Sequence, residues 1–348
     1  MLEVVGLTSD LYSIDGAVRV VDQVSFSIEP AKTLGLVGES GSGKTVTALS
    51  ILRLLPRNGR VVSGSVLLQG EDLLRKNERE MRTIRGNRLS IVFQDPLTAL
   101  NPALTIGRQI TEAVLAHRDI PRSDAEVEAV EALRAVRIPD PKSRVRSYPH
   151  ESSGGMQQRI LLAMAMINKP DVLIADEPTT ALDVTIQAQV LALIKELGTQ
   201  HKTGVLLITH NLGVIAQMCD RVAVMYAGEI VEEADTDDLF ERPLHPYTAA
   251  LMSSVPTGES IREKAINGLG LPVGAADSTQ GCRFRARCPY AEEVCTQHPP
   301  LLEVSERRSV RCWVAQRDLK ATDGTPIISK GAGQGDPHSP PPGPGSSS

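Results

Sequence analysis

Residues 34–45 read LGLVGESGSGKT, and this stretch decides the fold. Gly38 is followed after four residues by Gly43, Lys44 and Thr45, which completes the phosphate-loop pattern G-x4-G-K-[ST]. An apolar run before the pattern predicts a buried strand, and the residues after it have helical spacing. This strand–turn–helix context favours a phosphate site over a chance glycine-rich turn.

The same loop predicts how a nucleoside triphosphate is held. Its glycines let successive backbone N–H groups converge on phosphate oxygens at the positive end of the following helix. Lys44 can then reach the β- and γ-phosphates, and the Thr45 hydroxyl can bind Mg²⁺. The sequence thus predicts ATP and Mg²⁺ as cofactors. The expected phosphate contacts are Gly38, Ser40, Gly41, Ser42, Gly43, Lys44 and Thr45.

Length and composition limit the class of protein. The chain has 348 residues, enough for about two domains, and 41% of them are apolar, enough for a sizeable core. The net charge of −5 gives no bulk basic character that would indicate a nucleic-acid partner. The N-terminus lacks the features of a signal peptide, and no apolar run approaches the ~18 residues of a membrane span. We therefore expect a cytosolic protein without a transmembrane part of its own.

Strand and helix patterns alternate around the phosphate loop. This alternation predicts a mostly parallel sheet covered by helices, with a helical insertion from about 96 to 169. Near the N-terminus, residues 2–5 and 18–28 are predicted strands, and Tyr12 is expected in a short loop between them. Tyr12 is a candidate to stack on a nucleotide base, and an ordinary packed tyrosine is the alternative.

Polar residues at the ends of predicted strands supply the expected chemistry. Asp176 ends the apolar run DVLIAD and is a candidate Mg²⁺ ligand together with Thr45. Glu177 comes next and can polarise an attacking water as a general base. Gln94 follows another strand and can contact Mg²⁺ and water, whereas His210 follows a third and can orient Glu177 or bind the γ-phosphate. Ordinary capping and packing roles are the alternatives, which the upstream phosphate loop disfavours because phosphoryl transfer needs both parts.

Residues Ser153, Gly154 and Gly155 open another helix and predict a second anion site by the same physics. One triphosphate needs only one such helix end from each chain. The presence of two therefore suggests that two chains meet face to face, each completing the ATP site of the other.

These motifs, in this order, resemble the ATP-binding cassette family over residues 1 to about 318. The resemblance adds Gln94, Asp183 and His210 to the expected nucleotide contacts. For nucleotide binding, it implies that Tyr12 stacks on the base, that residues 38–45 form the Walker A loop and that Ser153 to Gly155 belong to the signature motif. For hydrolysis, it implies that Asp176 ends Walker B and that Glu177 is the catalytic glutamate. Gln94 is then the Q-loop glutamine, Asp183 lies in the D-loop and His210 is the switch histidine.

One branch of the family is a closer match. Residues 152–156 read SSGGM where the family has L-S-G-G-Q, so Ser152 and Met156 depart from the family pattern. Met at this position is nevertheless usual in the ATPase subunits of oligopeptide, dipeptide and nickel importers. Stretches similar to that branch are QDPLTALNP at 94–102, YPHE at 148–151 and HPYT at 245–248. The resemblance implies an ATPase that couples hydrolysis to import of peptides or similar solutes. It also implies a peripheral place on the cytoplasmic face of the inner membrane, a second ATPase subunit, two permease subunits and, indirectly, an extracytoplasmic binding protein.

Four of the five cysteines gather near the C-terminus: Cys282, Cys288, Cys295 and Cys312. In a cytosolic chain such a cluster suggests metal rather than disulfides, and thiolates suit either Zn²⁺ or an iron–sulfur cluster. This segment also resembles the C-terminal extension of the importer branch, members of which carry a [4Fe–4S] cluster there. The resemblance therefore favours that cluster, with zinc and unligated thiols as the alternatives.

The expected fold is an α/β P-loop NTPase with a mostly parallel sheet, an antiparallel β subdomain, a helical insertion and a small cysteine-rich C-terminal module. We expect a nucleotide-binding domain at 1–255, the C-terminal extension at 256–318 and a disordered tail at 319–348. Two rival functions stay open. A cassette ATPase acting on DNA or ribosomes usually shows coiled-coil insertions or tandem cassettes, neither of which is visible in the sequence. A catalytically weak or regulatory partner in an asymmetric pair is disfavoured by the intact Lys44 and Glu177.

Overall fold

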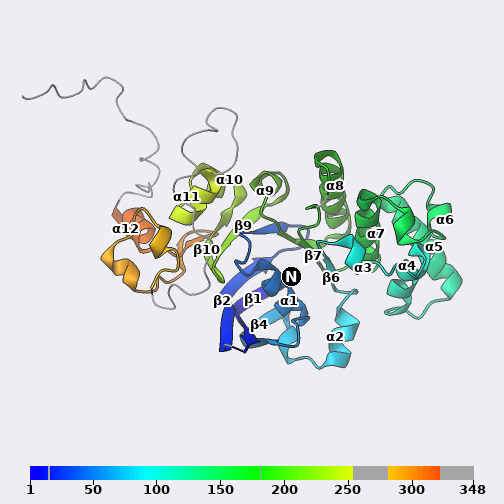
Figure 1. The fold of residues 1–348 in the computed structure, drawn as a ribbon, viewed down its shortest axis with the longest axis horizontal. Helices are drawn as coiled ribbons and strands as arrows, with labels where there is room; N and C mark the ends of the chain where they lie inside the picture. Colours follow the sequence, from blue (N-terminus) through cyan, green and yellow to red (C-terminus); the bar gives the residue numbers. More distant parts are fainter. Residues whose placement is uncertain (15, 181, 254–280, 322–348) are drawn as a thin grey trace, which may run out of the picture.

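The computed structural model describes residues 1–14, 16–180, 182–253 and 281–321, and two β-sheets organise this part of the chain (Figure 1). The smaller sheet is antiparallel, in the order β2-β1-β4-β5. Its strands are β1 (Leu2–Ser13), β2 (Gly16–Ile28), β4 (Gly59–Leu68) and β5 (Glu71–Asp72). The larger sheet has the order β11-β12-β10-β9-β3-β8-β7-β6. Its strands are β3 (Thr33–Val37), β6 (Leu89–Val92), β7 (Val172–Asp176), β8 (Gly204–Ile208), β9 (Arg221–Tyr226), β10 (Glu229–Asp235), β11 (Leu302–Ser305) and β12 (Arg308–Val310).

Strands β6, β7, β8, β3 and β9 form the parallel part of the larger sheet. Every residue of β3, β7 and β8 is buried, which explains their continuous apolar sequences, since parallel strands are covered on both faces. Because parallel strands end at one edge, the residues that follow them meet there. The predicted α/β fold with a mainly parallel centre and an antiparallel subdomain is confirmed.

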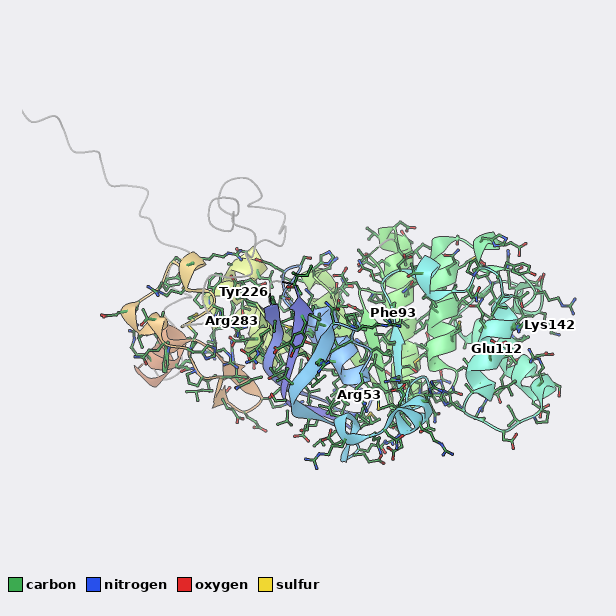
Figure 2. The ribbon with its side chains drawn as sticks, turned by 60° about the horizontal axis from the view of Figure 1, so that its bottom comes forward. Arg53, Phe93, Glu112, Lys142, Tyr226 and Arg283 are labelled. Carbon is green, nitrogen blue, oxygen red and sulfur yellow. The ribbon has the colours of Figure 1, made fainter. Side chains whose placement is uncertain are left out.

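Helices surround this sheet. Those near the phosphate loop and the sheet are α1 (Lys44–Leu52), α2 (Glu78–Ile84), α8 (Val184–His201), α9 (Leu212–Met218), α10 (Thr236–Glu241) and α11 (Pro246–Ser253). Those in the stretch predicted as a helical insertion are α3 (Pro96–Ala99), α4 (Ile106–Leu115), α5 (Arg122–Ala135), α6 (Pro141–Arg144) and α7 (Gly154–Met166). Figure 1 shows α4 to α7 gathered at one end of the molecule, and Figure 2 places Glu112 and Lys142 there, far from Tyr226 and Arg283. None of the helices in the described ranges is long and apolar enough to cross a membrane.

Strand β1 differs from the prediction for the N-terminus. It continues to Ser13, so Tyr12 lies within the strand and pairs with Ala17, not in a loop. Its pairing with β2 shifts register between Val4 and Leu7 and again further on. Such bulges change which face a side chain takes, and this obscured the period-two pattern in the sequence.

The C-terminal segment is joined to the larger sheet and is not a free-standing module. It contains β11, β12 and α12 (Trp313–Ala321), with single 3-10 turns at Arg285–Arg287 and Glu293–Thr296. Strand β12 pairs antiparallel with β10, with Val310 opposite Glu232. Helix α12 extends past residue 319, where the tail was predicted to begin. The first part of the predicted extension, residues 256–280, and the rest of the predicted tail lie outside the described residues.

Candidate functional site

The phosphate loop joins β3 to α1, as predicted. Gly43 is the N-cap of α1 with φ +105°, and a Cβ there would lie 2.6 Å from the Val20 carbonyl oxygen, so only glycine fits. Lys44 is buried, and its Nζ donates to the carbonyl oxygens of Gly38 at 2.8 Å and Glu39 at 2.9 Å. Burial lowers the pKa of Lys44, while nearby carboxylates, Glu177 foremost, oppose the shift. The ammonium group is therefore held inside the curve of the loop.

A pair of oxygen ligands lies beside the loop. The Thr45 hydroxyl donates to Asp176 Oδ1 at 3.3 Å, which joins the start of α1 to the end of β7. Asp176 is buried, and burial raises its pKa against the lowering effect of the Thr45 hydrogen bond. A hydroxyl and a carboxylate are the hard oxygen donors that Mg²⁺ prefers, so these two residues fit that ion chemically.

Glu177 is the most heavily contacted carboxylate of the site. Its Oε1 lies 3.0 Å from His210 Nδ1, and its Oε2 accepts from Gln94 Nε2 at 3.2 Å and from the Thr180 hydroxyl at 2.7 Å. Burial raises the pKa of Glu177, but the hydrogen bonds from His210 and Thr180 outweigh it, and the net pKa is lowered. The carboxylate is therefore ionised at neutral pH and can accept a proton.

The backbone of Glu177 is also unusual. Its φ of +46° is in the left-handed region, which is uncommon for residues other than glycine and is concentrated at functional sites. The three side chains around its carboxylate come from the ends of β6, β7 and β8, so the sheet brings together the predicted Gln94, Glu177 and His210. Thr180 was missed by the sequence reasoning, although a hydroxyl three residues after the predicted general base was a usable signal.

The second predicted anion site starts a different helix. Ser153 is the N-cap of α7, and its Oγ accepts from the Met156 backbone N–H at 3.4 Å. A Cβ on Gly155 would lie 2.5 Å from Ile186 Cγ2, so this glycine lets α7 pack closely against the start of α8. Asp183 caps α8 by accepting from the backbone N–H groups of Thr185 and Ile186. In the described part of the chain, no hydrogen bond joins Ser153, Gly154 or Gly155 to the phosphate loop.

Tyr12 lies at the end of β1 with 43% of its surface exposed. The guanidinium carbon of Arg60 lies 5.9 Å from the centre of its ring. An exposed aromatic side chain at the end of β1 is compatible with stacking on a base, which stays a prediction.

The cysteine prediction is not supported by the geometry. Cys282 and Cys288 are half-buried against apolar neighbours, and Cys295 and Cys312 are buried. Burial raises the pKa of Cys288 to about 11 and that of Cys312 to about 12, which keeps these thiols neutral. Within residues 1–14, 16–180, 182–253 and 281–321, no three His, Cys, Asp or Glu side chains are grouped so that they could hold a metal ion.

Comparisons with known proteins show which family models and which relatives this chain is similar to. Residues 21–180 match the family model described as ABC transporter, and residues 231–295 match the model of the oligopeptide/dipeptide transporter C-terminal region. The chain is 49% identical to a probable peptide ABC transporter ATP-binding protein of Sinorhizobium fredii, over 90% of this chain and 94% of that protein. It is 42% identical to the oligopeptide transport ATP-binding protein OppD of Salmonella typhimurium, over 92% of this chain and 95% of that protein.

Among solved structures, the fold is similar to that of an ATP-binding cassette described as a dimer in a post-hydrolysis state bound to ADP and phosphate. The TM-score is 0.61 at 24% sequence identity, over 68% of this chain and 99% of the other. At this identity, the comparison shows the fold alone.

Proposed function

Because the chain belongs to the ABC transporter family, in its branch of oligopeptide and dipeptide transport ATP-binding subunits, we propose that it hydrolyses ATP to drive peptide import through separate membrane subunits. One observation carries this proposal. The Glu177 carboxylate is hydrogen-bonded by His210, Gln94 and Thr180 at the sheet edge where the Thr45–Asp176 pair also lies.

Phosphate binding is assigned to the loop. The Lys44 ammonium, which now donates to backbone carbonyls, is placed to bind the β- and γ-phosphates. Thr45 and Asp176 would hold Mg²⁺, which neutralises phosphate charge when it is bound.

Glu177 is assigned the proton transfer. A water oxygen attacks the γ-phosphorus, the bond to the ADP oxygen breaks, and the water proton passes to the Glu177 carboxylate. His210 and Gln94 orient that carboxylate through the hydrogen bonds described above. The positions of His210 and Gln94 therefore limit where the attacking water can lie.

The ATP site is completed by a second chain. The N-terminus of α7, with Ser153 as its cap, presents backbone N–H groups and the positive end of a 13-residue helix. We propose that this end binds the γ-phosphate held by the phosphate loop of a partner ATPase subunit, which is either a second copy or a related chain. The D-loop residue Asp183 lies at the adjoining end of α8.

A groove offers a place for the membrane subunits. It has a volume of about 730 Å³ and lies between the sheet and the helical region. Phe93, which is labelled in Figure 2, is 38% exposed and precedes the Gln94 loop. It lines the groove together with His117 and Met164. We propose that a cytoplasmic segment of a permease subunit docks here, so that movement of Gln94 and α7 is transmitted to the membrane. The chain would then be peripheral, on the cytoplasmic face of the inner membrane.

This function predicts the effect of Ser153→Arg on transport. In cells without their own copy, the wild-type chain should restore uptake of a radiolabelled tripeptide, and Ser153→Arg should leave uptake at the level of cells lacking the chain. An arginine side chain at the start of α7 would occupy the place of the phosphate. Ser143→Arg, the same change on an exposed turn of α6, is the matched control and should support normal uptake.

A second measurement separates the two parts of the proposal. Purified Ser153→Arg protein should still bind ATP, because its own phosphate loop is intact. Full uptake with Ser153→Arg would show that the face-to-face arrangement is wrong. Normal ATPase activity of the wild type without any peptide uptake would show that the solute is not a peptide.

The division of the chain and its metal content are proposed on the resemblance. We propose a nucleotide-binding domain at 1–255 with its helical part at about 96–169 and a C-terminal extension from 256, whose predicted end at 318 moves to the end of α12 at Ala321, with the tail after it. On the resemblance and on the four soft thiol ligands in one short segment, we propose that the extension carries a [4Fe–4S] cluster on Cys282, Cys288, Cys295 and Cys312, although the described side chains are not grouped as metal ligands in the structure.

The metal proposal is tested by analysis of protein purified without oxygen. Near-stoichiometric iron and sulfide with broad visible absorption are expected for the cluster. One zinc per chain would replace it with a zinc site. Colourless protein free of metal, with four thiols that titrate in the folded state, would refute any metal at these cysteines.

A further inference from the structure

The C-terminal segment contacts the phosphate loop directly through Arg287. The Nη1 and Nη2 atoms of Arg287 each lie 3.0 Å from one carboxylate oxygen of Glu39, which is the residue after Gly38 in the loop. The Arg287 side chain is 10% exposed and that of Glu39 is 28% exposed. A two-point contact of this kind is stronger and more directional than a surface ion pair.

Aromatic side chains fix the position of this guanidinium. Its central carbon lies 5.7 Å from the ring centre of Tyr226 and 5.8 Å from that of Phe284. Tyr247, from the HPYT stretch, packs against both rings, and its hydroxyl accepts from the Glu39 backbone N–H at 2.9 Å. Glu39 is therefore held at its side chain by Arg287 and at its backbone by Tyr247.

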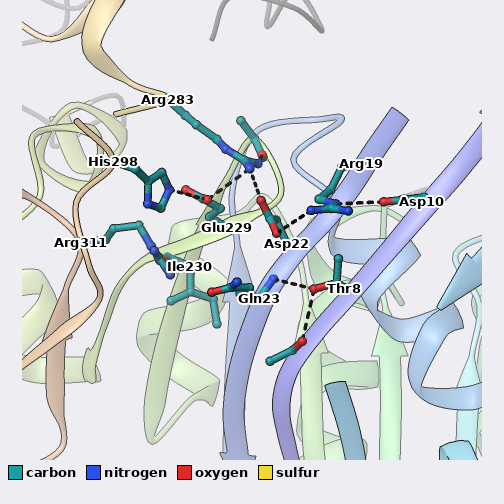
Figure 3. A network of polar contacts seen from close by, with 12 residues as sticks. Thr8, Asp10, Arg19, Asp22, Gln23, Glu229, Ile230, Arg283, His298 and Arg311 are labelled. Atoms are coloured by element: carbon teal, nitrogen blue, oxygen red, sulfur yellow. Dashed lines mark hydrogen bonds and ion pairs between the residues drawn. The ribbon is translucent and has the colours of Figure 1, made fainter. Parts of the chain in front are cut away.

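Arg283 makes a second connection from the same segment (Figure 3). It forms ion pairs with Asp22 of β2 and with Glu229 of β10, and it donates to the Ala227 carbonyl. Gly228, which follows Ala227 in the chain, donates its backbone N–H to the Ser42 carbonyl at 2.9 Å. The segment is therefore linked to both ends of the phosphate loop.

We propose that Arg287 is a positioning residue for ATP binding, acting through Glu39. The loop receives a triphosphate of high negative charge, and an unpaired carboxylate in the loop would repel it. Arg287 neutralises Glu39 and keeps its carboxylate directed toward the C-terminal segment. This inference rests on the proposed ATP-binding function.

The test uses the full chain with its permease partners and measures ATPase activity against ATP concentration. Arg287→Met should raise KM for ATP about tenfold, within the range of coupling for contacting charged residues, and change kcat much less. Arg317→Met is the matched control, because Arg317 forms an exposed ion pair with Glu292 in the same segment. It should leave KM and kcat unchanged.

The decisive variant is the double substitution. Glu39→Gln added to Arg287→Met removes the exposed charge and should return KM to within about threefold of wild type. A structural role alone would predict no rescue, since both variants lack the ion pair. An unchanged KM in Arg287→Met, or a KM that stays high in the double variant, would overturn the proposal. Wild-type protein that binds no ATP would instead overturn the proposed function.

Discussion

Glu177→Gln should abolish ATP turnover while leaving ATP binding intact. The amide keeps the shape of the side chain but cannot take the proton from water, and loss of a general base typically costs about 10²–10⁴-fold in rate. Lys44, Thr45 and Asp176 are untouched, so affinity for ATP should change little. ATPase activity of the complete transporter and ATP binding by the isolated chain are the two measurements.

The variant should also hold two chains together. If ATP closes the dimer and hydrolysis reopens it, a chain that binds ATP without cleaving it should elute as a dimer in size-exclusion chromatography with ATP. Thr180→Val is a useful control, because it removes one hydrogen bond to the same carboxylate and should reduce the rate only moderately. Turnover by Glu177→Gln near the wild-type rate would rule out Glu177 as the base.

Lys44→Ala should weaken ATP binding and stop hydrolysis. A hydrogen bond to a charged group contributes about 1.5–3 kcal/mol, so affinity should fall by roughly 10- to 100-fold. Isothermal titration calorimetry on the purified chain measures this directly. Hydrolysis should fall further, because charge that develops on the transferred phosphoryl group would lack its nearest cation.

Lys32→Ala is the matched control for that variant. Lys32 forms an exposed ion pair with Asp220 away from the loop, and its loss should leave ATP affinity unchanged. A thermal melt should show that Lys44→Ala is still folded, since the buried ammonium also bonds to the loop carbonyls. Unchanged affinity in folded Lys44→Ala would remove the phosphate-loop assignment.

The sequence was sufficient for those parts of the site that are local. The phosphate loop, the Asp176–Glu177 pair and the strand-end positions of Gln94 and His210 each follow from a short motif beside a buried strand. Because parallel strands end at one edge of the sheet, the residues that follow them are expected to lie close together.

Longer-range features could not be read in the same way. The partners Glu39 and Arg287 are 248 residues apart, and neither has a local pattern that points to the other. Tyr12 was misplaced because bulges interrupt the alternation of β1. The cysteine spacing showed a cluster in sequence, but whether these side chains are grouped in space as metal ligands depends on the packing of the segment, which spacing does not show.

The pairing of β12 with β10 has a consequence for the solubility of the chain. Val310 and Ser309 face Glu232 and Glu233 across this pairing, and Arg311 donates its backbone N–H to the Val231 carbonyl. A chain cut before β11 would present β10 as an open edge strand, with unpaired backbone groups free to join the sheet of another molecule.

The same cut would leave a buried carboxylate without its ion-pair partner. Glu232 is fully buried and forms an ion pair with Arg308, which the cut removes. Loss of one partner from a buried pair costs about 3–5 kcal/mol. By covering β10 and pairing with Glu232, the C-terminal segment should therefore reduce aggregation of the chain. Versions shortened to isolate the ATPase part are expected to precipitate before any defect in catalysis could be measured.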